Sequence, residues 1–326
     1  MALRRREWLA LGAGPWLLPA AAARHEQRVL FGSPVDLLLP PGSPPAAAQQ
    51  LWRGLEAMNA RWNAWKQGDV SELNQAIAHD RSARVTPALR NLILGAARLE
   101  QRSLGHFNAG IGGLVAQWGF HADELRPGLE PTTGQLSPWV AARPSLSQLR
   151  VQGLRVRSTN PLLRLDFGGY AKGVALDWAL DVLQRAGVHS ALLNLGGNLA
   201  AMGRLSDRPW SVGLRNPHGP GLVARLHTRG REAVVTSGTY ARFRWVGGVR
   251  RGHVIDPRVG APAAGLASVT VVHADAALAD AAATALLVAG RPGWISIARS
   301  LGVQQVLVID DAGRLQATPA MRSSLG

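Results

Sequence analysis

Residues 166–173, which read Asp-Phe-Gly-Gly-Tyr-Ala-Lys-Gly, constrain this chain more than any other stretch. A mostly apolar run, residues 162–165, precedes them, and an amphipathic stretch, residues 174–183, follows. The pattern predicts a strand, a tight glycine turn and a helix that begins at the turn. The backbone N–H groups of a helix start are free and attract anions, and glycines let an anion come close to the backbone. The segment therefore favours an anion-binding turn, although a plain glycine turn has the same pattern.

The two charged residues of this segment strengthen the first interpretation. The chain has 36 lysines and arginines together, yet its only lysines are Lys66 and Lys172. A compact ammonium and a planar guanidinium are not interchangeable at a phosphate, so a lysine kept at a helix start suits a phosphate group. Asp166 could hold a cation or a sugar hydroxyl. The alternative for Lys172 is an ordinary surface lysine.

Residues 1–23 have the pattern of an export signal. Three arginines, an apolar run over residues 8–18 and small residues up to Ala23 are the three regions of a cleaved signal peptide. Arg5 and Arg6, followed by Trp8 and Leu9, resemble a twin-arginine signal. A membrane anchor is the alternative, but the run is too short to span a bilayer comfortably. We expect cleavage near Ala23, a periplasmic location, and a mature domain of residues 24–326 that does not itself span a membrane.

The charge and the cysteine count limit the partners. The formal net charge is +15, and removing residues 1–23 takes away three arginines and one glutamate, which leaves about +13. The arginines are scattered and no nucleic-acid-binding motif is present, so we expect no nucleic acid but an anionic ligand such as a phosphate ester. The chain has no cysteine, which excludes disulfides and a lipid-anchor cysteine.

The periodicities predict a mixed α/β (α+β) fold in a single large domain. Thr86 followed by Pro87 indicates a helix start, since threonine caps helices and proline fits their first position. We expect a loop over residues 121–144 and a C-terminal hairpin over residues 303–318. Helices are expected at 45–64, 86–104, 169–186 and 274–289, and strands or hairpins at 25–39, 162–166, 192–195, 199–203, 210–214, 223–226, 233–236 and 268–273.

Three further patterns carry possible chemistry. Asp280 and Thr284 lie four residues apart on a predicted helix, so both oxygens share one face, where a carboxylate and a hydroxyl suit Mg²⁺. A solvated aspartate with a threonine bonded to its own helix is the alternative. His253, in Gly-His-Val-Ile-Asp-Pro, could act as a general base, or it could be a surface histidine in a turn. Residues 194–198 and 236–240 place amides and hydroxyls beside glycines, which fits either a ligand or plain turns.

The order of these motifs resembles the FAD:protein FMN transferase (ApbE) family. The likeness runs from about residue 27 to residue 318 and includes Ser-Glu-Leu-Asn at 71–74 and Phe-Asn-Ala-Gly at 107–110. It implies one large domain of the T-fold-like type, with mixed sheets flanked by helices. It also implies Mg²⁺-dependent transfer of FMN from FAD to a threonine hydroxyl of an exported or membrane redox flavoprotein, through a phosphoester bond, with release of AMP.

The resemblance also implies roles for single residues. Gly169, through its carbonyl, would hold the metal with Asp280 and Thr284, and His253 would be the catalytic base. Residues implied to contact FAD are Trp65, Asn108, Ala109, Gly110, Asp166, Lys172, Val254 and Ile255. Asn108 and Thr239 stand where the family usually has aspartates, and Asn63 and Gly113 also depart from its pattern. Two other functions therefore stay open, a Mg²⁺-dependent FAD pyrophosphatase and a non-catalytic FAD-binding accessory protein for redox-complex assembly.

Overall fold

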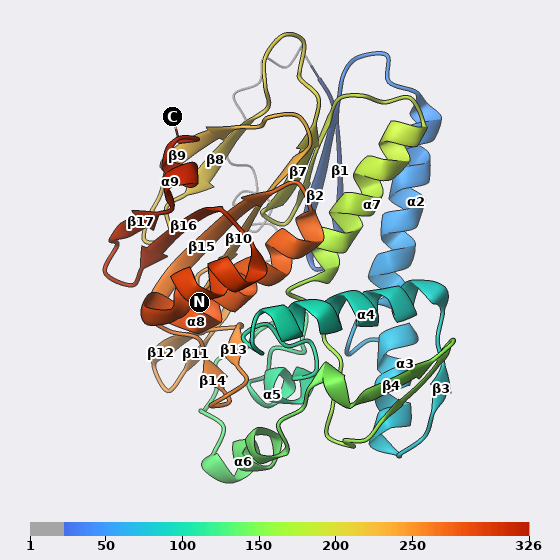
Figure 1. The fold of residues 1–326 in the computed structure, drawn as a ribbon, viewed down its shortest axis with the longest axis vertical. Helices are drawn as coiled ribbons and strands as arrows, with labels where there is room; N and C mark the ends of the chain where they lie inside the picture. The colour runs from blue at the N-terminus through green and yellow to red at the C-terminus, as the bar shows by residue number, and fades with distance from the viewer. Residues whose placement is uncertain (1–22, 326) are drawn as a thin grey trace.

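The computed structural model describes residues 23–325, so the proposed signal peptide, apart from Ala23, lies outside the described residues. An antiparallel eight-stranded sheet, in the order β1-β2-β6-β7-β10-β15-β16-β17, forms the centre of the fold. Helices α7 and α8 pack against one face of this sheet, and α2 packs outside α7 (Figure 1). Helices α3, α4, α5 and α6 and a small three-stranded sheet lie below this layer in the view, whereas α9 lies beside β16 (Figure 1). The expected mixed α/β single domain is confirmed.

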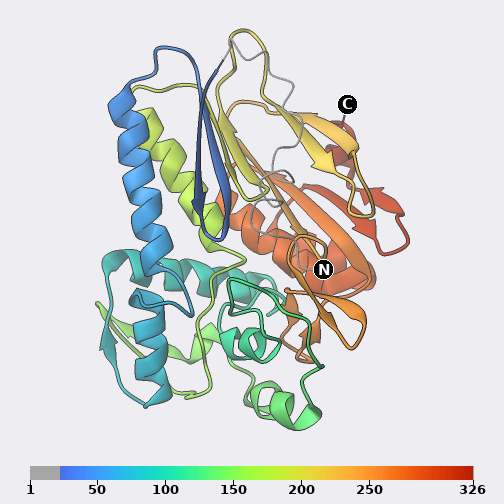
Figure 2. The same cartoon turned by 180° about the vertical axis from the view of Figure 1, so that it is seen from behind.

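The central strands are hydrophobic on both faces. Strand β15 (Leu266–His273) is buried along almost its whole length. Val271 belongs to the cluster beneath α7 and α8, whereas Val272 belongs to a second cluster on the opposite face. Side chains alternate across a strand, so a two-sided core needs a run of consecutive apolar residues. The reverse view shows the β8–β9 hairpin on the second face (Figure 2).

The strands agree with most of the sequence predictions. The predicted hairpins at 25–39 and 303–318 are confirmed as β1–β2 and β16–β17. The strands of the large sheet are β1 (Arg24–Leu30), β2 (Ser33–Leu39), β6 (Ala191–Leu195), β7 (Asn198–Met202), β10 (Glu232–Gly238), β15, β16 (Gln305–Asp310) and β17 (Leu315–Ala317). The smaller sheets contain β3 (Ala83–Arg84), β4 (Leu149–Gln152), β5 (Arg155–Ser158), β8 (Ser211–Arg215), β9 (Leu222–His227), β11 (Phe243–Val246), β12 (Val249–Gly252), β13 (Ile255–Asp256) and β14 (Ala261–Pro262).

The helices follow their local start signals. Thr86 caps α4, where its Oγ1 accepts a hydrogen bond from the N–H of Leu89 and Pro87 occupies the first helical position, as predicted. Such a cap contributes about 1 kcal/mol. The helices are α2 (Pro45–Arg61), α3 (Asp69–Ala78), α4 (Pro87–Arg102), α5 (Gly112–Gln117), α6 (Thr133–Ala142), α7 (Ala171–Arg185), α8 (Ala276–Leu301) and α9 (Pro319–Arg322).

Three sequence predictions need correction. The strand expected at 162–166 is not formed, because this segment makes one isolated bridge, between Ile111 and Arg164, and otherwise bonds to a loop. The loop expected at 121–144 contains α6, which begins with a capping box of Thr132 and Gln135. The backbone of α8 is non-helical at Gly290, directly after the predicted end at residue 289, but a second helical stretch that was not predicted continues to Leu301.

Helices α7 and α8 cap one another. Both oxygens of Asp177, on α7, accept backbone hydrogen bonds at the start of α8, from Ala276 N at 3.0 Å and Ala277 N at 2.9 Å. In return, Oδ2 of Asp280, on α8, accepts from Gly173 N, in the first turn of α7, at 2.9 Å. A Cβ at Gly173 would lie 2.2 Å from the carbonyl oxygen of Ala276, so this close approach needs glycine. The starts of the two helices therefore form one unit.

Among residues 23–325, one helix is long and apolar enough to span a membrane by length and composition. This is α8, and 67% of its apolar window is buried inside the protein. Its buried face packs on β10 and β15, as expected of a core helix.

Candidate functional site

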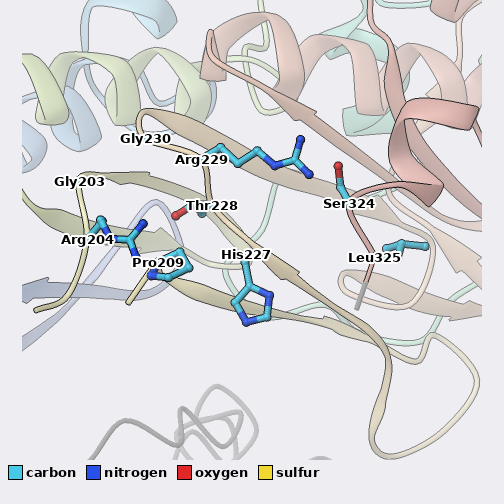
Figure 3. Close-up of a pocket in the computed structure, with 9 residues that line it drawn as sticks. All are labelled: Gly203, Arg204, Pro209, His227, Thr228, Arg229, Gly230, Ser324 and Leu325. Atoms are coloured by element: carbon cyan, nitrogen blue, oxygen red, sulfur yellow. The ribbon is translucent and has the colours of Figure 1, made fainter. Parts of the chain in front are cut away.

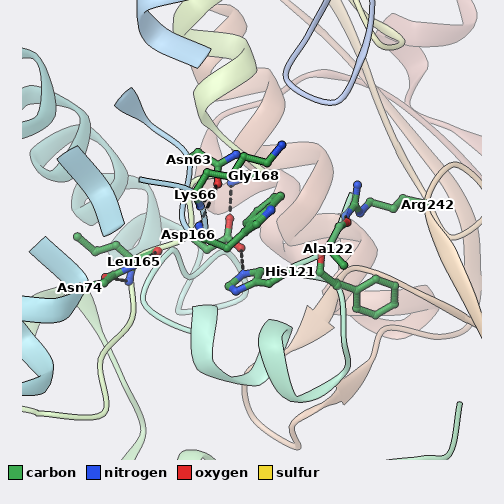
Figure 4. A network of polar contacts seen from close by, with 11 residues as sticks. Asn63, Lys66, Asn74, His121, Ala122, Leu165, Asp166, Gly168 and Arg242 are labelled. Carbon is green, nitrogen blue, oxygen red and sulfur yellow. Dashed lines mark hydrogen bonds and ion pairs between the residues drawn. The ribbon is translucent and has the colours of Figure 1, made fainter. Parts of the chain in front are cut away.

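The glycine turn is held in place by distant parts of the chain. The N–H of Asp166 donates to the carbonyl of Ala109 at 2.8 Å. The side chain of Asn74, on α3, accepts from the N–H of Leu165 at 2.7 Å and donates to the carbonyl of the same residue at 2.9 Å. Oδ1 of Asp166 accepts from Gly168 N at 2.9 Å and closes the turn (Figure 4). These bonds, rather than a sheet, fix the entry into α7.

Asp166 belongs to a stack of polar and aromatic groups. Its Oδ2 lies 2.8 Å from Nε2 of His121, and the His121 ring stacks on Trp65 with centroids 4.9 Å apart (Figure 4). Burial alone would raise the pKa of Asp166, but the hydrogen bond and positive field of His121 and the N–H of Gly168 hold that pKa below its usual range. The carboxylate is therefore ionised at neutral pH. Trp65 is 39% exposed, so part of its ring faces the solvent.

The three predicted metal ligands lie together. Asp280 is 2% exposed and sits one helical turn before Thr284 on α8. A Cβ at Gly169 would lie 2.7 Å from Thr284 Oγ1, so the Gly169 backbone contacts this hydroxyl directly. Oγ of Ser237, on β10, lies 3.4 Å from the same hydroxyl. The alternative of a solvated Asp280 is wrong, because this carboxylate is in the core.

These groups fit a hard divalent cation. Asp280 accepts one hydrogen bond on each oxygen, from Gly173 N and from Asn198 Nδ2, both at 2.9 Å. Each carboxylate oxygen has a second lone pair that remains for a metal. Burial raises the pKa of Asp280, although the charge of Lys172 and the hydrogen bonds from Gly173 and Asn198 act in the opposite direction. The described residues contain no cluster of three or more His, Cys, Asp or Glu that could hold a metal. One carboxylate, a hydroxyl and a carbonyl instead suit Mg²⁺ that keeps waters or ligand phosphates.

His253 is held as a neutral acceptor. It follows β12 directly, and the carbonyl of Arg242 lies 3.0 Å from its Nδ1. A carbonyl only accepts, so Nδ1 carries the proton and Nε2 keeps a lone pair. Burial, and then the positive charges of Lys172 and Arg242, lower the pKa of His253 to about 4. His253 lies at a bend and is half-buried, and its ring is held by the carbonyl of Arg242.

Lys172 connects the two halves of the site. It lies in the first turn of α7, where its ammonium favours an anion, whereas the neighbouring N–H groups of Ala171 and Gly173 already donate to Phe167 O and to Asp280. Its charge acts on both His253 and Asp280, lowering the pKa of each. His253, Asp280 and the start of α7 therefore share one electrostatic environment.

The other predicted contact residues are mainly structural. Asn108 donates to the carbonyl of Pro144 at 2.7 Å and accepts from Gly110 N at 2.7 Å, and the first bond needs an amide rather than a carboxylate. Ala109 is buried and bonds Asp166 through its backbone. The carbonyl of Val254 accepts from Ala263 N at 2.8 Å, and Ile255 is buried in the cluster around Phe120. Contacts of these residues with a ligand stay predictions.

A separate cavity of about 670 Å³ contains none of the predicted site residues. Two arginines and a histidine lie around it on the β8–β9 side of the sheet (Figure 3). It is lined by Gly203, Arg204, Pro209, His227, Thr228, Arg229, Gly230, Ser324 and Leu325. The candidate site is therefore defined by the side chains around Asp166, His253 and Asp280, and not by this cavity.

Sequence reasoning missed three residues at the site. His121 and Arg242 were given no role, and Asn198 was only one of several turn residues. Asn198, at the start of β7, donates to Asp280, and Arg242 supplies the carbonyl that holds His253. Local sequence offered no signal for His121, which lies 45 residues from its partner Asp166.

Comparisons with known proteins assign the chain to a family. The ApbE family model matches residues 31–307, so the chain belongs to the ApbE family. Proteins named FAD:protein FMN transferase are 40% identical in Rhodobacter capsulatus, over 97% of this chain, and 28% identical in Vibrio cholerae, over 98% of it. The chain spans 61% of the length of the first relative and 99% of the second. The family is thus one of flavin transferases.

Solved structures show the same fold. The flavinyl transferase ApbE of Pseudomonas stutzeri superposes with a TM-score of 0.81 at 25% identity, covering 93% of this chain and 97% of its own. The ApbE protein of Thermotoga maritima superposes with a TM-score of 0.85 at 24% identity, covering 93% of this chain and 99% of its own. The latter likeness concerns the fold alone.

Proposed function

We propose that this protein transfers FMN from FAD to a threonine hydroxyl of an exported or membrane redox protein, through a phosphoester bond and with release of AMP. One observation carries the proposal: a neutral histidine, a lysine at a helix start and a buried aspartate one helical turn before a threonine meet at a single site. Phosphoryl transfer needs mainly positioning and charge neutralisation, and these groups supply both. Relatives named for this reaction support the same conclusion.

Each residue then has a defined task. Nε2 of His253 takes the proton of the threonine hydroxyl, whose oxygen attacks the phosphorus of the FMN half of FAD. The bond from that phosphorus to the bridging oxygen breaks, and AMP leaves. Lys172, in the first turn of α7, holds the pyrophosphate through its positive charge. Trp65 stacks on a flat ring of FAD, and the ionised carboxylate of Asp166 accepts hydrogen bonds from its hydroxyls.

Asp280, Thr284 and the carbonyl of Gly169 would hold Mg²⁺, which when bound offsets the charge on the pyrophosphate. We further propose that the protein works in the periplasm after export by the twin-arginine route, with Arg5 and Arg6 as the signal. That location would place it beside exported acceptor domains. Its acceptor is a threonine-bearing flavoprotein of a membrane redox complex.

The direct test uses an acceptor domain that carries a modifiable threonine. The domain is incubated with this protein, FAD and Mg²⁺, its intact mass is measured, and AMP is followed in parallel. A mass gain of one FMN that is lost with EDTA supports the transferase. Release of AMP with no mass gain, for every acceptor tried, favours the FAD pyrophosphatase. Intact bound FAD with neither product favours the accessory protein.

Removing the exposed aromatic ring should weaken FAD binding. We expect Trp65→Ala to raise the Kd for FAD about 2- to 12-fold, because stacking of aromatic rings contributes about 0.5–1.5 kcal/mol. Quenching of flavin fluorescence on titration gives the Kd. Trp65→Phe, which keeps an aromatic ring, is the matched variant, and its Kd for FAD should rise less than that of Trp65→Ala. An unchanged Kd in Trp65→Ala would show that the ring does not touch FAD.

Adding one methyl group at the metal site should weaken Mg²⁺ binding. In Gly169→Ala the new Cβ would lie 2.7 Å from Thr284 Oγ1 and would displace that hydroxyl. We expect the Mg²⁺ concentration for half-maximal activity to rise roughly 10- to 100-fold, as for changes beside metal ligands. Gly168→Ala is the control, because its Cβ meets only Oδ1 of Asp166, at 3.1 Å. Equal Mg²⁺ dependence in both variants would refute the placement of Gly169.

A further inference from the structure

We propose that Arg242 is a positioning residue, which fixes the base His253 and the Trp65–His121 ring pair relative to one another. This inference rests on the proposed function, in which His253 takes a proton and Trp65 holds FAD. The backbone of Arg242 serves the first group and its side chain serves the second. A single residue thereby sets the distance between the proton acceptor and the flavin platform.

The backbone half of the arrangement comes from a hairpin. Arg242 directly precedes β11 and His253 directly follows β12, and the end pair Phe243 and Gly252 brings them side by side. The carbonyl of Arg242 accepts from the N–H of His253 at 3.1 Å and from its Nδ1 at 3.0 Å. Two bonds to one oxygen fix both the backbone and the ring of His253.

The side-chain half reaches the ring pair. Nη2 of Arg242 donates to the carbonyl of Phe120 at 2.8 Å and to that of Ala122 at 2.7 Å, the two neighbours of His121 (Figure 4). The guanidinium carbon also lies 6.0 Å from the centroid of the Trp65 ring. The same segment also contacts His253, because the Phe120 ring packs edge-on against the His253 ring with centroids 6.3 Å apart. Arg242 therefore contacts both His253 and the segment that carries the ring pair, and that segment in turn contacts His253.

The charge of Arg242 has a separate effect from its hydrogen bonds. Burial lowers its pKa, while Asp166 and Asp123 act in the opposite direction, and an arginine stays charged at neutral pH. The charged groups that act on His253 are Lys172 and Arg242, which disfavour its protonation, and Asp166, which favours it. Removing the charge of Arg242 therefore raises the pKa of His253. Removing its guanidinium N–H donors while keeping the charge leaves that pKa unchanged.

Two variants separate these effects. Arg242→Gln removes the charge, and we expect the pKa of His253 to rise by about 1 unit. Arg242→Lys keeps the charge but replaces the planar fork that bonds two carbonyls, so the pKa should stay while the KM for FAD rises. The pKa is read from the imidazole signals of the full-length mature protein by NMR, and the spectrum of His253→Asn identifies the signal of His253. This readout does not depend on turnover.

Arg244 offers a matched control on the same hairpin. Its side chain also donates to two loop carbonyls, those of Trp118 and Arg126, but it is not among the groups that act on His253. Arg244→Gln should leave the pKa of His253 unchanged. The proposal is overturned if Arg242→Gln leaves that pKa in place, if Arg244→Gln moves it equally, or if Arg242→Lys binds FAD as the wild type does. If the variants change the pKa of His253 and the KM for FAD as expected, but the wild-type protein transfers no FMN, only the proposed function is refuted.

Discussion

Replacing Asp280 by alanine should remove Mg²⁺-dependent FMN transfer, with kcat/KM falling at least about 100-fold, as when a group that stabilises developing charge is lost. The change deletes the only carboxylate among the proposed metal ligands. It also leaves Gly173 N and Asn198 Nδ2 without an acceptor, which costs about 1–3 kcal/mol for each buried donor. Transfer is measured by the mass of the acceptor and by AMP release over a Mg²⁺ titration.

Because the alanine variant also loses stability, Asp280→Asn is tested beside it. The amide keeps the shape but not the charge, so folding is better preserved while Mg²⁺ is still lost. Mg²⁺ should raise the Tm of the wild type in the presence of FAD, since a bound ligand stabilises the folded state, and should not raise that of Asp280→Asn. Asp181→Ala, an exposed acid on α7, is the control and should behave as the wild type. A Mg²⁺-dependent Tm in Asp280→Asn would mean that the metal lies elsewhere.

Replacing His253 by alanine should lower kcat by about 10²- to 10⁴-fold, the usual contribution of a general base. FAD binding should change little, because the proposed role of this ring is to take the threonine proton. Single-turnover transfer rates and the Kd for FAD are measured separately. His79→Ala, at an exposed position, should keep full activity. Loss of FAD binding with an unchanged rate at saturation would assign His253 to the ligand pocket instead.

The pH dependence gives an independent check on the same residue. A base acts in its neutral form, and burial and nearby cations lower the pKa of His253 to about 4, below the ordinary value near 6.5. Proton uptake by His253 therefore limits kcat/KM only as the pH falls toward 4, and its contribution is constant from about pH 5.5 upward. A His253-dependent acid limb near pH 6.5 would contradict the structure.

The sequence predicted those features that have local signals. Thr86 and Pro87 place the start of α4, and the glycine segment places the start of α7. The four-residue spacing of Asp280 and Thr284 predicts a shared helical face. The order of motifs identified the family, which the family match confirms. The roles of the individual residues stay predictions.

The features that sequence reasoning missed depend on distant contacts. Residues 162–166 read as a strand because they are apolar, yet they bond to residues 109–112 and to Asn74 rather than to a sheet. Helix α6 did have a local signal, the capping box of Thr132 and Gln135, which the prolines around it obscured. The roles of His121 and Arg242 arise from partners 45 and about 120 residues away.

The mutual capping of α7 and α8 has a kinetic consequence. Asp177, in the second turn of α7, bonds first-turn amides of α8, and Asp280, in the second turn of α8, bonds a first-turn amide of α7, so opening either helix through its second turn releases the start of the other. The two helix starts should therefore form one cooperative opening unit, and the amides of Gly173, Ala276 and Ala277 should exchange with deuterium at a common rate. Lys172, at one end, and Asp280, at the other, would then be lost or restored in the same event, so partly assembled sites would be rare.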